Sequence, residues 1–135
     1  MKKNIKVTRE YEIIGDKKIL ICECKYDDHG NMIYKKNKCG DEYYYKYDDH
    51  NNMIYKKDYN GREFYWEYKY DDHGNKIYEK DPYGNKYHYK YDDHNNKIYM
   101  KDSDGDEFYY KYDDNDNMIY KKDCDGNEYH YKYEY

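Results

Sequence analysis

The sequence predicts an all-β protein: an antiparallel β-meander of about 12 strands, made of tandem β-hairpin repeats of roughly 21 residues and forming a twisted or coiled sheet. A Tyr-Lys-Tyr-Asp-Asp motif, with Cys for its first tyrosine in one copy, recurs at the tyrosines that head five copies: Tyr26, Tyr47, Tyr70, Tyr91 and Tyr112. Short runs rich in Tyr, Ile and Met separate regular turn signals. No helical periodicity is present, and Pro82 falls inside a turn. These features are typical of stacked hairpins.

The first 25 residues differ from the repeats and are predicted to form a capping hairpin. Aliphatic residues such as Ile5 and Ile13 concentrate there, around a turn at Gly15. Terminal units of stacked proteins are usually atypical, because they close an otherwise open end. We therefore expect one domain in which residues 1–25 cap five repeats at residues 26–135.

Two kinds of turn alternate within the repeats. The first follows the Asp-Asp pair and contains Gly or Asn, which tolerate a positive φ. The second closes on a glycine for the same reason. These glycines are Gly40, Gly61, Gly84, Gly105 and Gly126.

Alternation separates the two faces of the longer strand in each repeat. Tyr43, Tyr45 and Tyr47 are predicted to share one face, a tyrosine ladder that points inward, while Tyr44 and Lys46 lie on the other. The isoleucines of the shorter strands are expected to join the ladder, and the tyrosine after each isoleucine to lie among lysines whose stems cover its ring. The isoleucines are Ile33, Ile54, Ile77, Ile98 and Ile119.

Composition limits the classes of function. Charged residues make up 41% of the chain and the net charge is -5, with both signs interspersed, which disfavours a duplex nucleic acid as partner. The 26 tyrosines nevertheless supply enough buriable area for a fold. No stretch approaches the length of a membrane span, and no signal peptide is recognised, so we expect a cytoplasmic protein without a membrane partner. The four cysteines are expected to be free thiols.

The repeats resemble the YD repeat of bacterial rearrangement-hotspot and teneurin-like proteins. The pattern is Tyr-x-Tyr-Asp, then Gly or Asn, then Gly before the next Tyr-x-Tyr-Asp, as in Tyr45-Lys46-Tyr47-Asp48 and Tyr89-Lys90-Tyr91-Asp92. The resemblance covers roughly residues 24–135 and implies a long β-meander that coils. In large members of the family the coil builds a shell around a toxin, and five copies are too few to enclose one.

A second, weaker likeness is to the choline- or glucan-binding repeats of cell-wall proteins. It is carried by the run Tyr44-Tyr45-Lys46-Tyr47-Asp48, followed by Asn52 and Met53. This likeness implies a carbohydrate-binding module, which stays open as an alternative function.

The sequence offers no basis for catalysis or a cofactor, and no metal-binding residues are predicted. A catalytic centre needs a base and an orienting group that are buried together, whereas every Asp and His set here is copied several times into turns. The repeated acidic pairs are explained by turn formation and solvation, and calcium binding at the turns near Asp104 and Asp125 stays open. We therefore predict a chain that is not an enzyme.

The predicted protein-binding residues fall into two groups. The second copy is two residues longer than the others and contains Arg62, Phe64 and Trp66, and Trp and Arg are enriched at interaction hot spots. The second group consists of the exposed aromatics and acidic turns expected on the sheet: Tyr44, Tyr109, Asp48, Asp49, Asp71 and Asp72.

These observations lead to a functional hypothesis. The chain is interpreted as a non-enzymatic repeat scaffold that binds another protein, for example an immunity protein or a phage or mobile-element inhibitor of a toxin, nuclease or defence complex. Single-stranded nucleic acid, stacked on Tyr44, Tyr109, His88 and His130 beside the lysine row, is a less favoured partner. A structural fragment of a larger YD-repeat protein is the remaining alternative.

Overall fold

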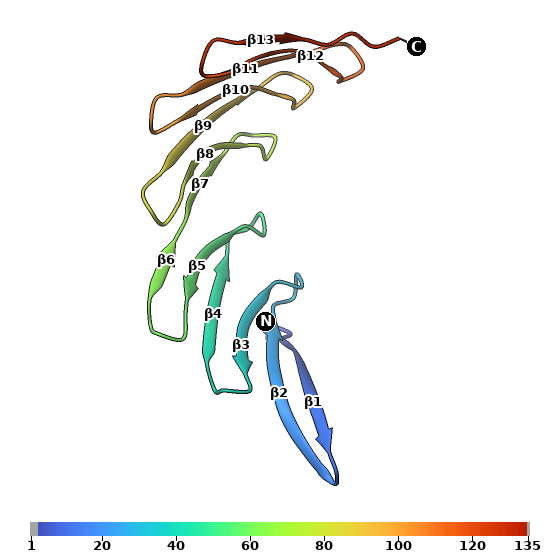
Figure 1. The fold of residues 1–135 in the computed structure, drawn as a ribbon, viewed down its shortest axis with the longest axis vertical. Helices are drawn as coiled ribbons and strands as arrows, with labels where there is room; N and C mark the ends of the chain where they lie inside the picture. The colour runs from blue at the N-terminus through green and yellow to red at the C-terminus, as the bar shows by residue number, and fades with distance from the viewer. Residues whose placement is uncertain (1–2, 135) are drawn as a thin grey trace. The chain divides into compact units, whose positions relative to one another are not determined.

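The computed structural model describes residues 3–134, which form thirteen antiparallel strands and no helix (Figure 1). The chain divides into two compact units, Met1–Trp66 and Glu67–Tyr135. The first unit contains β1 (Lys6–Ile14), β2 (Lys17–Tyr26), β3 (Met32–Asn37), β4 (Glu42–Tyr47), β5 (Met53–Lys57) and β6 (Glu63–Tyr65). The second contains β7 (Glu67–Tyr70), β8 (Lys76–Lys80), β9 (Lys86–Tyr91), β10 (Lys97–Asp102), β11 (Glu107–Tyr112), β12 (Met118–Lys122) and β13 (Glu128–His130). The predicted all-β hairpin meander is confirmed.

Each unit is one sheet in which strands follow one another in chain order. The first sheet runs from β1 to β6 and the second from β7 to β13, and every strand pairs only with its neighbours in the chain. Neighbouring strands make all the extensive contacts within each unit. None of the residues that the structure describes forms a helix long and apolar enough to cross a membrane.

A hydrogen-bonded aspartate or asparagine organises every turn of the repeats. In the first turn, Asp27 Oδ1 accepts the backbone N–H groups of His29 at 3.0 Å and Asn31 at 2.8 Å. This arrangement satisfies donors that the tight turn would otherwise leave unpaired. Gly30 adopts a φ of 83°, and Asn51, its counterpart in the next repeat, a φ of 62°, as the turn chemistry predicts. A side-chain oxygen accepts a backbone N–H group in the same way at Asn37, Asp48, Asp58, Asp71, Asp81, Asp92, Asp102, Asp113 and Asp123.

Acidification is expected to weaken these turns. Burial opposes ionisation of Asp27, but the hydrogen bonds from Asn31 and His29 outweigh it and lower the pKa of its carboxyl; in Asp81 the bond from Asn85 is the largest cause of the lowered pKa. A lowered folded pKa gives stability above the unfolded value of about 4, and this stability is lost as the pH falls through the folded pKa. The thermal midpoint should therefore be nearly constant between about pH 5 and 7 and fall steeply below about pH 4. A midpoint that stays level down to about pH 2 would contradict this role of the carboxylates.

A β-bulge lies at the isoleucine of every repeat. Lys25 of β2 pairs with Tyr34 of β3, whereas the next residue, Tyr26, pairs with Met32. Ile33 therefore has no partner on β2. Bulges increase the local twist of a strand and interrupt its alternation. The prediction that the isoleucines, as the most apolar side chains, join the tyrosine ladder stays a prediction, because the bulge interrupts the alternation that would assign them to a face. The same shift recurs at Ile54, Ile77, Ile98 and Ile119.

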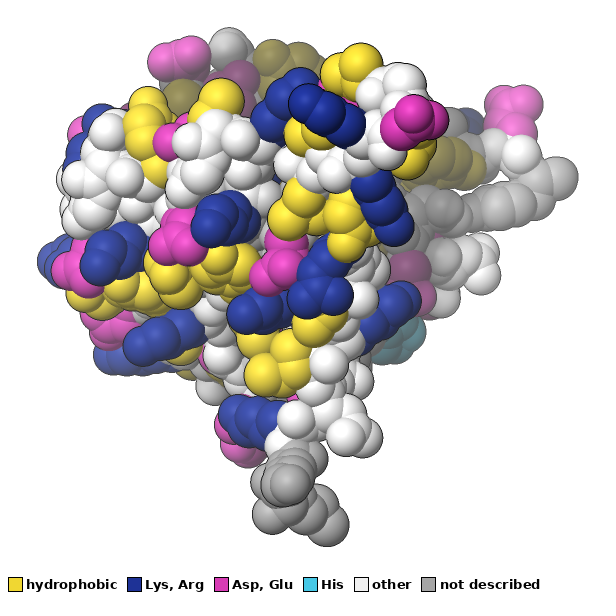
Figure 2. All heavy atoms as spheres, turned by 90° about the horizontal axis from the view of Figure 1, so that it is seen from below, with side chains coloured by type: hydrophobic (Ala, Val, Ile, Leu, Met, Phe, Trp, Pro, Cys, Tyr) yellow, Lys and Arg dark blue, Asp and Glu magenta, His cyan; other side chains and the backbone are white. Residues whose placement is uncertain are grey.

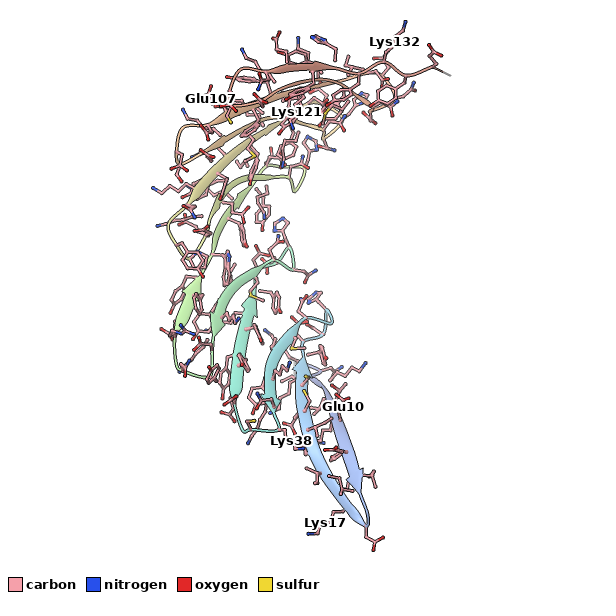
Figure 3. All side chains as sticks on the ribbon, viewed as in Figure 1. Glu10, Lys17, Lys38, Glu107, Lys121 and Lys132 are labelled. Atoms are coloured by element: carbon pink, nitrogen blue, oxygen red, sulfur yellow. The ribbon has the colours of Figure 1, made fainter. Side chains whose placement is uncertain are left out.

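The tyrosine ladder is half-buried and covers no core. Tyr43, Tyr45 and Tyr47 have intermediate exposure, and the only buried side chains in the described part of the chain are Cys24 and Asp58. Side chains leave both sides of the ribbon in each unit, as Figure 3 shows. The expectation that the ladder faces a core is thus wrong, because each single-layer sheet has no second layer to cover it. The ladder side of β4 is nevertheless less exposed than the side that carries Tyr44 and Lys46.

Hydroxyl groups, not a sealed interior, anchor the ladder. The Tyr47 hydroxyl donates to the backbone carbonyl of Met32 at 2.9 Å, next to a bulge. The lysine before the isoleucine also lies near a ladder ring, since Lys97 Nζ is 4.4 Å from the ring centroid of Tyr89. The bond to a carbonyl is repeated by Tyr91, Tyr112 and Tyr133.

Trp66 lies where the chain passes from one sheet to the next. In other repeats one residue, such as Tyr44, pairs with the strands on both sides. In this copy two residues divide the pairing with the preceding and the following strand. Tyr65 pairs only with the preceding strand β5, and Glu67 pairs only with the following strand β8. The backbone N–H of Trp66 donates to the carbonyl of Ile54 at 3.0 Å and extends the first sheet. At the two extra residues of this copy, the first sheet therefore ends and the second begins.

The N-terminal hairpin forms the edge of the first sheet. Its β2 pairs with β3, so it continues the repeats, and Arg9 bonds Glu23 across the hairpin at 2.7 Å. Every residue of β1 is exposed, and Ile13 exposes 67% of its surface. On β2 the side chains of Ile19 and Ile21 are partly buried, so the aliphatic residues of the hairpin are covered on β2 more than on β1. The first two residues of the predicted cap lie outside the described part of the chain.

All four cysteines are free, as predicted. Cys22 and Cys24 lie on the same strand with their sulfur atoms 3.4 Å apart, in hydrogen-bonding contact. Burial, followed by this contact with Cys24, raises the pKa of the Cys22 thiol.

Candidate interaction surface

One face of each sheet carries a repeated set of lysine and aromatic side chains. We name it the Tyr44 face after Tyr44, which shares it with Lys46 and with the tyrosine that follows each isoleucine. Lys46 Nζ lies 5.0 Å from the ring centroid of Tyr55, within the range of a cation–π contact. The predicted covering of these rings by lysines is confirmed. Equivalent lysine–tyrosine contacts are Lys25 with Tyr34, Lys69 with Tyr78, Lys90 with Tyr99 and Lys111 with Tyr120.

A second ring packs against each of these tyrosines from the following strand. Tyr34 and Tyr44 meet edge to face with their centroids 5.3 Å apart. Such aromatic pairs stabilise a sheet beyond the area that they bury. The pattern repeats in Tyr55 with Tyr65, Tyr78 with His88, Tyr99 with Tyr109 and Tyr120 with His130.

A glutamate fixes both hydroxyl groups of a tyrosine pair. Glu42 accepts a bond from Tyr34 at 2.8 Å and another from Tyr44 at 3.1 Å. Burial and then the bond to Glu42 raise the pKa of Tyr34 to about 12, and the two hydroxyl bonds lower the pKa of Glu42. The rings are therefore held in one orientation although they are partly exposed. Glu63 and Glu107 hold their own tyrosine pairs in the same way.

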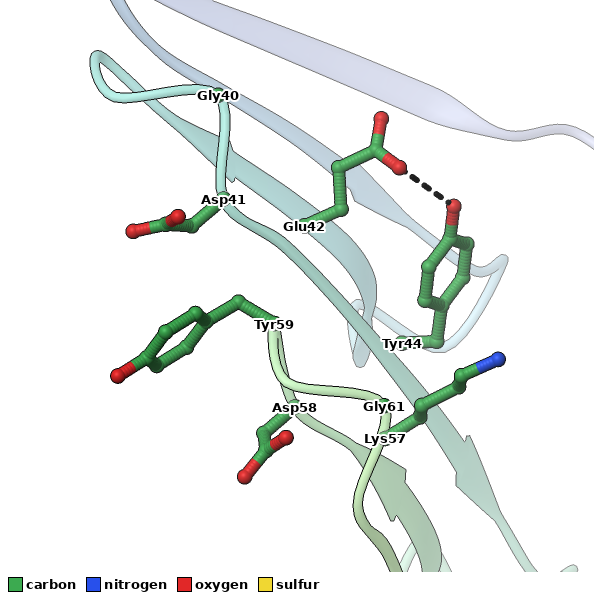
Figure 4. Close-up of a pocket in the computed structure, with 8 residues that line it drawn as sticks. All are labelled: Gly40, Asp41, Glu42, Tyr44, Lys57, Asp58, Tyr59 and Gly61. Carbon is green, nitrogen blue, oxygen red and sulfur yellow. Dashed lines mark hydrogen bonds between the residues drawn. The ribbon is translucent and has the colours of Figure 1, made fainter.

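A hollow opens beside Tyr44, between β4 and the end of β5 (Figure 4). Its lining includes Glu42, Tyr44, Lys57, Asp58 and Tyr59, and its volume is about 320 Å³. The Tyr59 ring packs against the ring of Tyr43, which lies on the opposite face, with the two ring centroids 5.9 Å apart. The hollow therefore combines three carboxylates, counting Asp41, with one lysine and two rings.

Arg62 is engaged in a turn. Its Nε donates to Asp58 Oδ2 at 2.8 Å, and its backbone N–H donates to Asp58 Oδ1 at 3.0 Å. The Asp58 side chain is only 7% exposed, whereas that of Arg62 is 67% exposed. Arg62 therefore neutralises a buried carboxylate while presenting part of its guanidinium to solvent.

Phe64 and Trp66 lie on the face opposite Tyr44 and are half-buried. Phe64 occupies the position of Tyr43, and Lys56 Nζ is 6.0 Å from its ring. Trp66 occupies the position of Tyr45 at the end of the first sheet. The structure brings Arg62, Phe64 and Trp66 together on one short segment, and it separates the last two from the Tyr44 face.

Tyr44 and Tyr109 are equivalent residues of different units. Their exposed fractions are 42% and 40%, and each donates its hydroxyl to a glutamate of its own strand, Glu42 or Glu107. The prediction that both lie on the exposed face is confirmed.

The two members of each acidic pair have different roles. Asp48 and Asp71 accept backbone N–H groups in their turns, so their carboxylates are structural. Asp49 and Asp72 are exposed and follow them in the chain. Of the predicted acidic surface, the second aspartates are therefore the ones available to a partner.

Sequence reasoning missed Tyr65 and the glutamates. Tyr65 is 59% exposed on the Tyr44 face, and Glu63 holds its hydroxyl at 3.2 Å. The spacing Glu-x-Tyr at the start of the return strand is the signal, because residues two apart on a strand share a face. The same spacing places Glu42 with Tyr44 and Glu107 with Tyr109.

Asp27, Asp28 and His29 are close enough to be considered for a metal ion. One ligand atom from each lies within 4.8 Å of the others, and this is the only such group in the described residues. Asp27 already accepts backbone N–H groups, and His29 Nδ1 lies 3.1 Å from Asp28 Oδ1. Turn formation accounts for the cluster, as the sequence suggested.

Comparison with solved structures identifies proteins of similar fold. The chain superposes on the crystal structures of TcdB2-TccC3 and TcdB2-TccC3-Cdc42, each with a TM-score of 0.61 and 16% identity. Its fold resembles a YD-repeat segment of a Tc toxin. A mutant Tc holotoxin pore from Photorhabdus luminescens matches equally well, with a TM-score of 0.61.

The match covers 87% of this chain and 7% of the Tc toxin chain. At 16% identity the likeness shows the fold alone. No protein-family model matches the chain, and no curated protein sequence does. The Tc toxin neighbours therefore support the β-hairpin repeat fold of this chain.

Proposed function

We propose that this chain is a non-enzymatic repeat scaffold that binds another protein through its Tyr44 face. The observation that carries the proposal is the row of partly exposed tyrosines whose orientation is fixed by neighbouring groups. Tyr44 and Tyr65 each pack against a second tyrosine and donate to a glutamate. Rings that are already ordered lose little conformational entropy when a partner covers them.

The mixed charge of the sheets suits a protein partner. Basic (dark blue), acidic (magenta) and hydrophobic (yellow) side chains alternate over the surface drawn in Figure 2, without separating into large patches of one kind. Aromatic anchors surrounded by mixed polar groups are typical of protein interfaces. A partner would bury the tyrosine rings and pair with the lysine and glutamate side chains around them.

The proposal includes a non-catalytic role in the cytoplasm. The aspartates of the turns are occupied by backbone N–H groups, as in Asp58 and Asp81, which supports a structural use of these carboxylates. Four free thiols support a reducing compartment. Similarity to toxin complexes supports the narrower proposal of an inhibitor or immunity protein that acts on a toxin, nuclease or defence complex.

Purification of the tagged chain from its host tests the binding surface. The wild-type chain is expected to retain one protein in stoichiometric amount, and Tyr44→Ala with Tyr65→Ala to lose it. Truncation of an aromatic hot spot costs about 2 kcal/mol, or roughly thirtyfold in affinity for each ring. The measurement is the dissociation constant of the purified pair.

Two further variants decide which surface binds. Tyr83→Ala is the matched control, because Tyr83 is 81% exposed on a turn and should leave the affinity unchanged. Trp66→Ala tests the opposite face. If Trp66→Ala or Asp49→Ala removes the partner while the double tyrosine variant keeps it, the Tyr44 face is not the binding surface. Retention on cell-wall glycans with no protein partner would overturn the proposed function itself.

A further inference from the structure

The hollow beside Tyr44 has a counterpart in the second unit with different chemistry. The second hollow lies between β9 and β10, and its lining includes Lys86, His88, Lys90, Tyr99, Lys101 and Ser103. Lys86 occupies the position of Glu42, since each lies two residues after the glycine of its turn and pairs with the preceding strand. We name this second site the basic hollow.

Lys86 reverses the charge found at its position in the other hairpins. Glutamate stands there in the other four hairpins of the repeats, and each glutamate pairs in register with a lysine. In β8 and β9 the pair is Lys80 with Lys86. Like charges directly opposite one another destabilise a sheet, so this substitution works against the fold. The glutamates are Glu42, Glu63, Glu107 and Glu128.

The positive charges of the basic hollow are only partly neutralised. Lys101 Nζ lies 3.4 Å from Glu107, but within residues 3–134 neither Lys86 nor Lys90 makes an ion pair with a carboxylate. Asp102 also lines the hollow, and its Oδ1 accepts backbone N–H groups of its own turn. Lys86 and Lys90 therefore supply positive charge that no carboxylate of the described residues neutralises in an ion pair.

The basic hollow is also wider than its counterpart. Its volume is about 640 Å³, compared with about 320 Å³ beside Tyr44. The smaller His88 and Ser103 stand at the positions of Tyr44 and Tyr59 in the first hollow. The backbone N–H of Lys86 donates to Ser103 Oγ at 3.3 Å, which joins the start of β9 to the next turn.

We propose that the basic hollow binds a phosphate group carried by a small molecule or by a peptide. Lysine ammonium groups on flexible stems bind phosphate as point charges, and Lys86, Lys90 and Lys101 converge on the hollow from two neighbouring strands. His88 and the Ser103 hydroxyl add groups that can donate hydrogen bonds to phosphate oxygens. A bound dianion would relieve the repulsion between Lys80 and Lys86. Lys90 and Tyr99 also belong to the Tyr44 face, but binding of a phosphate group in the basic hollow does not depend on a protein partner.

Calorimetric titration of the full chain with pyrophosphate tests the site. Lys86→Glu restores the residue of the other hairpins, so it should fold at least as well as the wild type while its affinity for pyrophosphate falls by about tenfold or more. Lys17→Glu makes the same change of net charge at the exposed start of β2, in the first hairpin, and should bind like the wild type. Equal losses in the two variants would show an effect of net charge alone and overturn the inference. So would a wild-type chain that does not bind.

A reciprocal variant and two peptides complete the test. Glu42→Lys with Tyr44→His places the residues of the basic hollow in the first unit and should add a second binding site for pyrophosphate.

A phosphoserine peptide, compared with the same peptide without the phosphate, distinguishes the two sources of the phosphate group. If the phosphopeptide binds more tightly than pyrophosphate and loses its advantage in Lys86→Glu, the natural ligand is a phosphorylated peptide; the opposite order indicates a free phosphate compound.

Discussion

Raising the pH from about 9 to about 12 is expected to unfold this protein in a transition that coincides with the ionisation of its tyrosines. Burial, then the bond to Glu42, raises the pKa of Tyr34 to about 12, and the bond to Glu63, then burial, does the same for Tyr55. A raised folded pKa gives stability that is fully present below the unfolded value of about 10 and is lost as the pH rises through the folded value. Burial also raises the pKa of Tyr45, Tyr47, Tyr91 and Tyr110.

Parallel titrations of circular dichroism and tyrosinate absorbance measure this transition. Because many tyrosines are protonated together in the folded state, ionisation should be steeper with pH than that of free tyrosine, and it should coincide with loss of the β signal. Tyr83→Phe removes the hydroxyl of the most exposed tyrosine among the described residues and should leave the alkaline midpoint unchanged. Gradual ionisation with the sheet signal intact up to about pH 12 would show that the hydroxyl bonds do not stabilise the fold.

Asp58→Ala is expected to be the most damaging single substitution in the turns. Asp58 is 7% exposed and accepts the backbone N–H groups of Asn60 and Arg62 together with Arg62 Nε. Its removal leaves these donors without their acceptor next to a hollow. Substitutions of this kind shift the melting midpoint by several degrees, on the order of 5 °C or more in a chain of this size.

Two variants make the Asp58 test specific. Asp58→Asn keeps an oxygen for the backbone N–H groups and loses only the charge, so its midpoint should lie between those of wild type and Asp58→Ala. Asp49→Ala removes an exposed carboxylate of the same sheet and should change the midpoint little. If Asp49→Ala and Asp58→Ala are equally destabilising, the turn bonds at Asp58 are not the cause.

The regular parts of the fold could be predicted because local chemistry determines them. Repeat length, strand order and the positive φ at Gly30 and Asn51 follow from turn residues and alternation. The bulge at Ile33 could not be predicted, because it depends on how two strands pair in three dimensions. The division at Trp66 had a signal in the two extra residues, but their number does not tell whether a strand lengthens, bulges or ends.

The candidate site was predicted by residue type more than by role. Tyr44 and Tyr109 were placed on the correct face by alternation, whereas Arg62 was selected for its hot-spot chemistry and turned out to bond Asp58. The contrast between Glu42 and Lys86 could be read from the repeats, since they occupy the same place in two copies. That this change places two lysines opposite one another could be seen only from the register, which pairs Lys86 with Lys80.

Pairing only between consecutive strands also bears on how the chain folds. In each unit the contacts that close a hairpin join residues near one another in sequence, so contact order is low for a β-protein and the entropy lost on closing each loop is small. Each hairpin can then form on the edge left by the one before it. Stability should grow with every added hairpin, and loss of the last strand should fray one end without unfolding the remainder.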